Sequence, residues 1–159
     1  MTSKRAERPS NIPWPPIVLV CTIAGAIIAH LVYPLSWPGG SVEDLLQGLG
    51  FFSILVAAGI YFLSGRELSR HRTTVLPTKG ADRLVTSGPF AVTRNPIYLA
   101  NVIFLIGLGL AAGIAWFFLA AIVCAVLEQK LAIEREEAHL EAKFGKAWRD
   151  YRKKVRRWI

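Results

Sequence analysis

Apolar residues along the chain are gathered into three blocks, separated by polar segments that contain Gly and Pro. The first block, Ile17–Tyr33, and the second, about Leu45–Leu63, are each close to the roughly 20 residues that a helix needs to cross a bilayer. The third, Ile97–Leu127, has 31 residues. As a single helix it would be about 46 Å long, against a hydrocarbon core of roughly 30 Å.

A break in the third block resolves this excess length. Gly107, Gly109 and Gly113 lie near its middle, and glycine permits the backbone angles that a tight turn requires. The pattern therefore predicts a hairpin, with one helix over about Ile97–Ala111 and a second from about Ile114. Each arm is short for a membrane span.

These elements define an all-α integral membrane protein with four membrane helices, the last two a short helical hairpin, and a C-terminal amphipathic helical segment. Gly48, Gly50 and Gly59 indicate close helix contact along the second span. We expect a single domain with five parts: a lead-in at 1–16, two spans in 17–63, a connector at 64–96, the hairpin at 97–127 and C-terminal helices at 128–159.

Charge sets the expected orientation. The loop Pro34–Asp44 has no Lys or Arg, whereas Ser64–Asn95 has six and the region from Glu128 onward has ten. Positive residues favour the cytoplasmic side, so we expect both termini in the cytoplasm, in a bacterial inner membrane. The net charge is +8, and the positive residues flank the apolar spans. This placement favours anionic lipid headgroups over nucleic acid as the partner. The oligomeric state is not implied.

Metal or disulfide chemistry is not indicated by the cysteines and histidines. Cys21 and Cys124 fall inside apolar blocks, and the three histidines are scattered along the chain. We therefore expect no metal site.

An apolar stripe continues through the basic C-terminal region. Its members recur at steps of four, four, three, four and three, which is typical of one helix face: Leu140, Phe144, Trp148, Tyr151, Val155 and Trp158. Gly145 is expected to divide the segment into two helices. The stripe fits a helix lying on an anionic membrane surface, or a segment that folds back as a lid over a site at the membrane edge.

The connector holds the most unusual segment, Leu84–Tyr98. It combines Gly88-Pro89 with Arg94-Asn95-Pro96. Gly permits unusual backbone angles and Pro fixes φ, so we expect this polar segment to adopt a defined backbone conformation. Asn95 and Pro96 suit the cap and first turn of a helix, whose free N–H groups favour a polar or anionic ligand. The simpler alternative is a capped helix start with an interfacial Arg.

Acidic residues cluster just after the third apolar block, at Glu128, Glu134, Glu136 and Glu137. Adjacent Glu136 and Glu137 point about 100° apart on a helix, so at most one faces a given pocket. An inward carboxylate suits ammonium or ribose hydroxyl groups. The alternative is helix solvation or pairing with Lys130, Arg135 or Lys143.

Two motifs together resemble a known superfamily. The first is LVTSGPF followed by RNPIY, over Leu84–Tyr98, and the second is EExxLxxxFGxxWxxYxxxV, over Glu136–Val155. They resemble the isoprenylcysteine carboxyl methyltransferase and phospholipid methyltransferase superfamily of integral membrane enzymes. The resemblance implies S-adenosylmethionine as cofactor, S-adenosylhomocysteine as product, and a lipidic or prenylated acceptor.

Site residues follow from this resemblance by position. Cofactor-binding residues are expected at Asp82, Arg83, Leu84, Val85, Phe90, Asn95, Pro96, Tyr98 and Glu136. Arg94 is expected to anchor the motif or to meet cofactor or substrate charge. Glu137 and Tyr98 are the candidates for a base, which an amine acceptor needs and a carboxylate acceptor does not. Arg94, Tyr98 and Glu137 form the expected catalytic set.

The sequence departs from the superfamily pattern at several positions. Asn95 replaces a frequent His, Ala100 a Gly and Trp148 a Tyr, and Arg156 stands where a Pro is usual. Ala132 occupies the position of an Arg that meets the substrate carboxylate in the prenylcysteine enzymes. Carboxylate and phospholipid amine acceptors therefore both stay open. The competing functions are a non-catalytic membrane interaction module and, with less support, a reductase on a related membrane fold.

Overall fold

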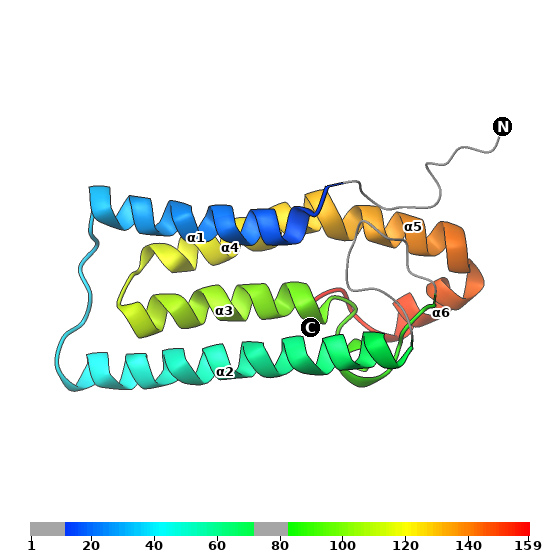
Figure 1. Ribbon diagram of the computed structural model, residues 1–159, viewed down its shortest axis with the longest axis horizontal. Helices are drawn as coiled ribbons and strands as arrows, with labels where there is room; N and C mark the ends of the chain where they lie inside the picture. Colours follow the sequence, from blue (N-terminus) through cyan, green and yellow to red (C-terminus); the bar gives the residue numbers. More distant parts are fainter. Residues whose placement is uncertain (1–11, 72–82) are drawn as a thin grey trace.

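The structure is a computed structural model that describes residues 12–71 and 83–159. Regular structure in these two ranges is helical (Figure 1). The elements in chain order are α1 (Trp14–Val32), α2 (Ser41–Arg70), the 3-10 turn η2 (Gly88–Ala91), α3 (Pro96–Ala112), α4 (Trp116–Glu128), the π-helical turn η3 (Gln129–Ile133), α5 (Glu134–Phe144) and α6 (Lys146–Lys154).

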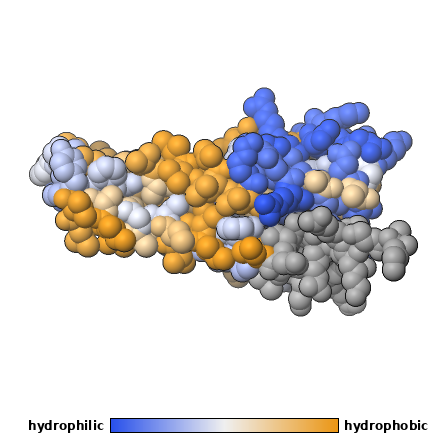
Figure 2. Space-filling model, turned by 90° about the horizontal axis from the view of Figure 1, so that it is seen from above, coloured by the Kyte–Doolittle hydropathy of each residue, from blue (hydrophilic) through white to orange (hydrophobic). Residues whose placement is uncertain are grey.

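Three helical stretches of the described chain are long and apolar enough to cross a membrane. They are α1, α2 and the continuous stretch Trp116–Phe144, and α3 is a shorter apolar helix. An apolar surface covers most of the bundle in the view of Figure 2, and hydrophilic residues gather at one end. Large exposed apolar side chains include Leu31, Leu55 and Ile122. The chain is thus built as an integral membrane protein.

The hairpin is present, with its turn where the glycines predicted it. Gly113 adopts a φ of +68° after α3, and the N–H of Ile114 donates to the carbonyl of Gly109 at 2.9 Å. The expectation of two short arms is wrong for the second arm. It continues from α4 through η3 into α5 as one 29-residue stretch, because no Gly or Pro interrupts the sequence between Trp116 and Phe144.

Close packing of α2 on α3 depends on two glycines. A Cβ at Gly50 would overlap the backbone of Ala111, and a Cβ at Gly107 would lie 2.9 Å from the Ile54 side chain. The prediction of close contact is confirmed at Gly50 and is wrong at Gly48 and Gly59, where a Cβ would meet nothing within 4 Å. The two unneeded glycines lie on other faces of the helix, since neither is four or seven residues from Gly50.

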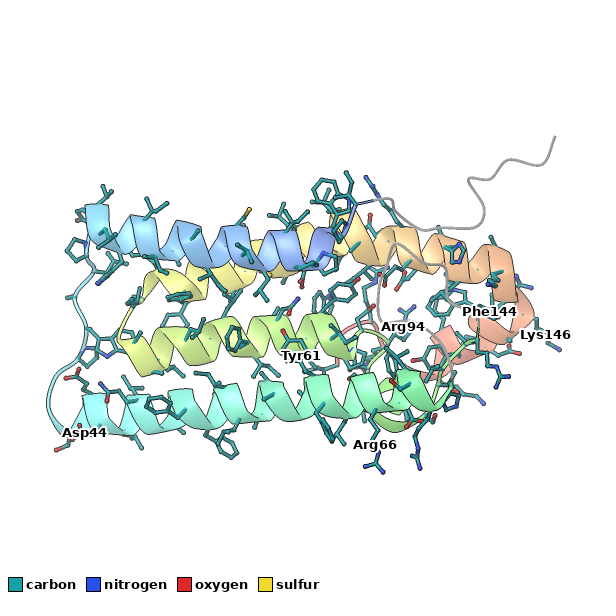
Figure 3. The ribbon with its side chains drawn as sticks, in the orientation of Figure 1. Asp44, Tyr61, Arg66, Arg94, Phe144 and Lys146 are labelled. Atoms are coloured by element: carbon teal, nitrogen blue, oxygen red, sulfur yellow. The ribbon has the colours of Figure 1, made fainter. Side chains whose placement is uncertain are left out.

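Aromatic residues fasten the end of the bundle that carries the hairpin turn and the α1–α2 loop (Figure 1). The indole N–H of Trp116 donates to the carbonyl of Tyr33 at 2.7 Å, and Trp37 stacks on Phe118 at 6.2 Å between ring centroids. Trp and Tyr favour the boundary between lipid and water. The opposite, hydrophilic end holds α5, α6 and the segment around Arg94 (Figure 3).

Candidate functional site

The first half of the connector motif is held by the end of α2. The Ser87 hydroxyl donates to Glu67 Oε1 at 2.5 Å. Gly88, at a φ of +58°, lies so near this side chain that a Cβ would be 3.3 Å from Glu67. The 3-10 turn η2 follows, and the Tyr151 hydroxyl of α6 donates to the carbonyl of Phe90 at 2.5 Å. The turn is therefore anchored at both ends.

The second half of the motif pairs with the C-terminal tail. Thr93 and Arg156 form a parallel bridge, and the Arg94 N–H donates to the carbonyl of Arg156 at 2.9 Å. The Arg157 carbonyl accepts from Thr93 Oγ1 and from Asn95 Nδ2, each at 3.0 Å. Segments about 60 residues apart in sequence are thus joined side by side, so the tail folds back onto the motif.

Asn95 performs a different task from the one expected. It occupies the N-cap position of α3, but its side chain makes no capping hydrogen bond. The amide is used instead on the Arg157 carbonyl, and the Asn95 N–H donates to Thr93 Oγ1 at 3.2 Å. Pro96 begins α3 as predicted and is almost fully buried.

Charges are concentrated where the motif meets α5. Glu137 accepts two hydrogen bonds from Arg157, at 3.0 and 2.7 Å. Arg94 Nη1 lies 3.0 Å from Glu137 Oε1 as an ion pair, and its guanidinium lies 5.4 Å from the centroid of the buried Trp148 ring. Burial lowers the pKa of Arg94, against the opposing effect of Glu137. The hydrogen bonds that Arg157 donates to Glu137 raise the pKa of Arg157.

Glu136 faces a different partner from its neighbour. The buried Tyr98 hydroxyl donates to Glu136 Oε1 at 2.6 Å. Ala132 and Ile133 pack around Tyr98, together with Trp14 and Trp158. Trp158 is fixed by a hydrogen bond from its Nε1 to Gln129 Oε1 at 3.1 Å. The 100° separation on the helix therefore assigns one carboxylate to the tyrosine and the other to the arginines.

A third polar group lies deeper in the bundle and was not predicted from the sequence. The Tyr61 hydroxyl of α2 donates to Asn101 Oδ1 of α3, and Asn101 Nδ2 donates to Glu128 Oε1 of α4. Glu128 was noted only as one acid of a cluster. Single polar residues in apolar helices give no spacing that would join them.

The predicted site residues fall into three groups. Phe90, Arg94, Asn95, Tyr98, Glu136 and Glu137 are brought together by the contacts above, and Pro96 starts the helix that carries Tyr98. Val85 is buried, Leu84 half-buried and Arg83 exposed. The contacts of Thr93–Asn95 with Arg156 and Arg157 form a motif–tail junction. In the described part of the chain, no hydrogen bond links the side chain of Arg83 to this junction. Asp82 lies outside the described residues.

The class of this protein is given by comparison with known protein families. A family model described as phospholipid methyltransferase matches residues 46–147. The chain belongs to the phospholipid methyltransferase family.

Particular relatives differ in what they are named for. The chain is 23% identical over 152 residues to the Delta(14)-sterol reductase LBR of Gallus gallus. The aligned region covers 91% of this chain and 23% of that protein. It is 36% identical over 63 residues to an uncharacterized protein of Haemophilus influenzae, covering 40% of this chain and all of that protein. It is 30% identical to the cobalt-zinc-cadmium resistance protein CzcN of Cupriavidus metallidurans, over 52% of this chain and 35% of that protein. No solved structure matches the chain.

Proposed function

We propose that this protein is an S-adenosylmethionine-dependent methyltransferase that acts on a lipidic acceptor at the cytoplasmic face of a membrane. The observation that carries the proposal is the junction of the two motifs. Backbone hydrogen bonds, the Arg94–Glu137–Arg157 group and the Tyr98–Glu136 pair lie together at the hydrophilic end of the bundle. Membership of the phospholipid methyltransferase family supports the reaction class.

The polar groups of this junction suit the proposed cofactor. Arg94 Nε and Trp148 Nε1 are buried and have no hydrogen-bond partner among the described residues. Buried donors of this kind usually have a partner, and a carboxylate or hydroxyl of a bound molecule would supply one. Glu136 offers carboxylate oxygens that fit ribose hydroxyls or an ammonium group. When bound, S-adenosylmethionine supplies a methyl group already activated on a sulfonium.

The residues of the junction have different roles in this proposal, according to their contacts. Both oxygens of Glu137 are occupied by Arg157, and Arg94 lies beside them. This engagement favours a role for Glu137 and Arg94 in holding the tail onto the motif, rather than a role in proton transfer. Tyr98 orients Glu136 through its hydroxyl. The chain thereby contributes binding geometry and exclusion of water, which are the main demands of a methyl displacement.

Calorimetric titration of the full chain in nanodiscs with S-adenosylhomocysteine tests this proposal. We expect saturable binding with one site per chain and no saturable binding of NADPH. The second ligand is included because one relative is named as a reductase. Binding of NADPH without binding of S-adenosylhomocysteine would indicate a redox reaction instead of the proposed methyl transfer. Binding of neither ligand would favour a non-catalytic module.

A further inference from the structure

A fully buried carboxyl group lies inside the helix bundle, away from the motif–tail junction. Glu128 has none of its surface exposed, and its Oε1 accepts from Asn101. Its Oε2 has no hydrogen-bond partner in the described part of the chain, and Cys124, a weak donor, lies beside it. Figure 3 shows Tyr61 on the side of α2 that faces α3.

Position along the helix places this group at the depth of the hydrocarbon. Glu128 comes twelve residues after Trp116, which is about 18 Å at 1.5 Å per residue. Glu136 comes eight residues later, about 12 Å further along the axis. With Trp116 near one boundary, Glu136 lies near the other. The carboxyl group of Glu128 therefore lies well inside the membrane, in a bundle whose outer surface faces lipid.

The π-helical turn aligns the two acids on one face. Eight residues of α-helix would place Glu128 and Glu136 about 80° apart around the axis, at 100° per residue. The turn Gln129–Ile133 lies between them, and its i→i+5 bonds make each turn wider. The rotation per residue falls, so both acids face α3, where Asn101 and Tyr98 are three residues, or about one turn, apart.

A purely structural role leaves this arrangement unexplained. Tyr61 and Asn101 would hold α2 and α3 together without an acid, and an apolar substitute of similar volume is often as stable as a buried ionic group. Acidic residues within membrane spans usually mark the path of a substrate or ion. The Tyr61 hydroxyl and one Asn101 N–H are used within the cluster. The Cys124 thiol near Glu128 is a weak donor, so Oε2 keeps acceptor capacity for a ligand.

We propose that Glu128, Asn101 and Tyr61 form an acceptor subsite that binds the hydroxyl or amine head of an amphiphile through Glu128 Oε2. The inference rests on the proposed methyl transfer, and names the class of acceptor for it: a head that donates a hydrogen bond, rather than a carboxylate. A carboxylate head would meet a second carboxyl group with no cation among the cluster residues.

Binding of matched amphiphiles tests the subsite without any turnover. Tritiated dodecanol, dodecylamine and dodecanoate are measured by scintillation proximity on the full chain in phosphatidylcholine nanodiscs, with empty nanodiscs subtracted. We expect saturable binding of dodecanol or dodecylamine at least tenfold tighter than that of dodecanoate. Glu128→Leu should weaken the tighter ligand at least tenfold, and Tyr61→Phe should weaken it less. Glu134→Gln, an exposed acid on the same helical stretch, is the matched control and should change nothing.

Two further measurements keep the outcomes distinct. Glu128→Gln preserves volume and an oxygen for Asn101, so it tests the same claim if Glu128→Leu does not fold. Wild-type binding that favours dodecanoate, that does not saturate for any probe, or that survives both Glu128 substitutions overturns the subsite and leaves the cluster as a helix contact. Titration of the same samples with S-adenosylhomocysteine reports separately on the proposed function. If the wild-type protein binds dodecanol but not S-adenosylhomocysteine, the proposed methyltransferase function is wrong and the amphiphile subsite stands.

Discussion

Glu136 and Glu137 are adjacent in sequence, yet their side chains have separate partners. Glu137 is committed to Arg157 and Arg94, while Glu136 accepts only from Tyr98 among the hydrogen bonds described for it. A carboxylate held by one hydroxyl keeps acceptor capacity for a ligand. At this scale, Glu136 is the better candidate for cofactor contact and Glu137 for positioning the tail.

Conservative substitution of this pair should reduce cofactor affinity without unfolding the protein. We expect Tyr98→Phe and Glu136→Gln each to weaken S-adenosylhomocysteine binding about tenfold, or 1.4 kcal/mol, because hydrogen bonds to charged groups contribute roughly 1.5–3 kcal/mol. Calorimetry provides the measurement. Glu134→Gln on α5 serves as control, since its exposed side chain pairs with Lys130. Equal affinities in all three variants would show that the Tyr98–Glu136 pair lies outside the cofactor site.

At the scale of elements, the sequence predicted the hairpin but not the shape of its second arm. Gly113 marks the turn because its positive φ favours glycine. The π-helical turn Gln129–Ile133 contains neither Gly nor Pro, so no local signal distinguishes it from α-helix. The motifs predicted that the connector and the C-terminal region act together, and a backbone hydrogen bond from Arg94 to Arg156 joins these segments. Tyr61 and Asn101 could not be joined from sequence, because 40 residues separate them and only the packing of α2 on α3 brings them together.

The packing of α2 on α3 provides a paired test at the same scale. We expect Gly50→Ala to lower the thermal unfolding midpoint by about 3–10 °C, because overpacking a close contact costs roughly 1–3 kcal/mol. Gly48→Ala should leave the midpoint unchanged or slightly raise it, since its Cβ meets nothing within 4 Å. Intrinsic tryptophan fluorescence of the purified protein in detergent reports the transition. A midpoint for Gly50→Ala at or above that of Gly48→Ala would contradict the close approach of the two helices.

Across the whole molecule, the two ends of the bundle have different characters. One end carries the hairpin turn and the contacts of Trp37 and Trp116, and the other carries the basic tail, which returns to the start of α3 (Figure 1). The tail is bound to the motif because the Arg94 N–H donates to the Arg156 carbonyl and Thr93 Oγ1 donates to the Arg157 carbonyl. This return joins two motifs from opposite sides of the hairpin into one surface, on which the proposed function depends.

Hydrogen–deuterium exchange with and without S-adenosylhomocysteine tests that joint surface most directly. The full chain in nanodiscs is compared at saturating and zero ligand, with exchange followed by peptide. Our account predicts that the ligand slows exchange both in the motif segment, residues 88–98, and in the tail, residues 136–158, while α1 is unchanged. Protection confined to one of these segments, or absent from both despite binding, would contradict a cofactor site built from the motif and the tail together.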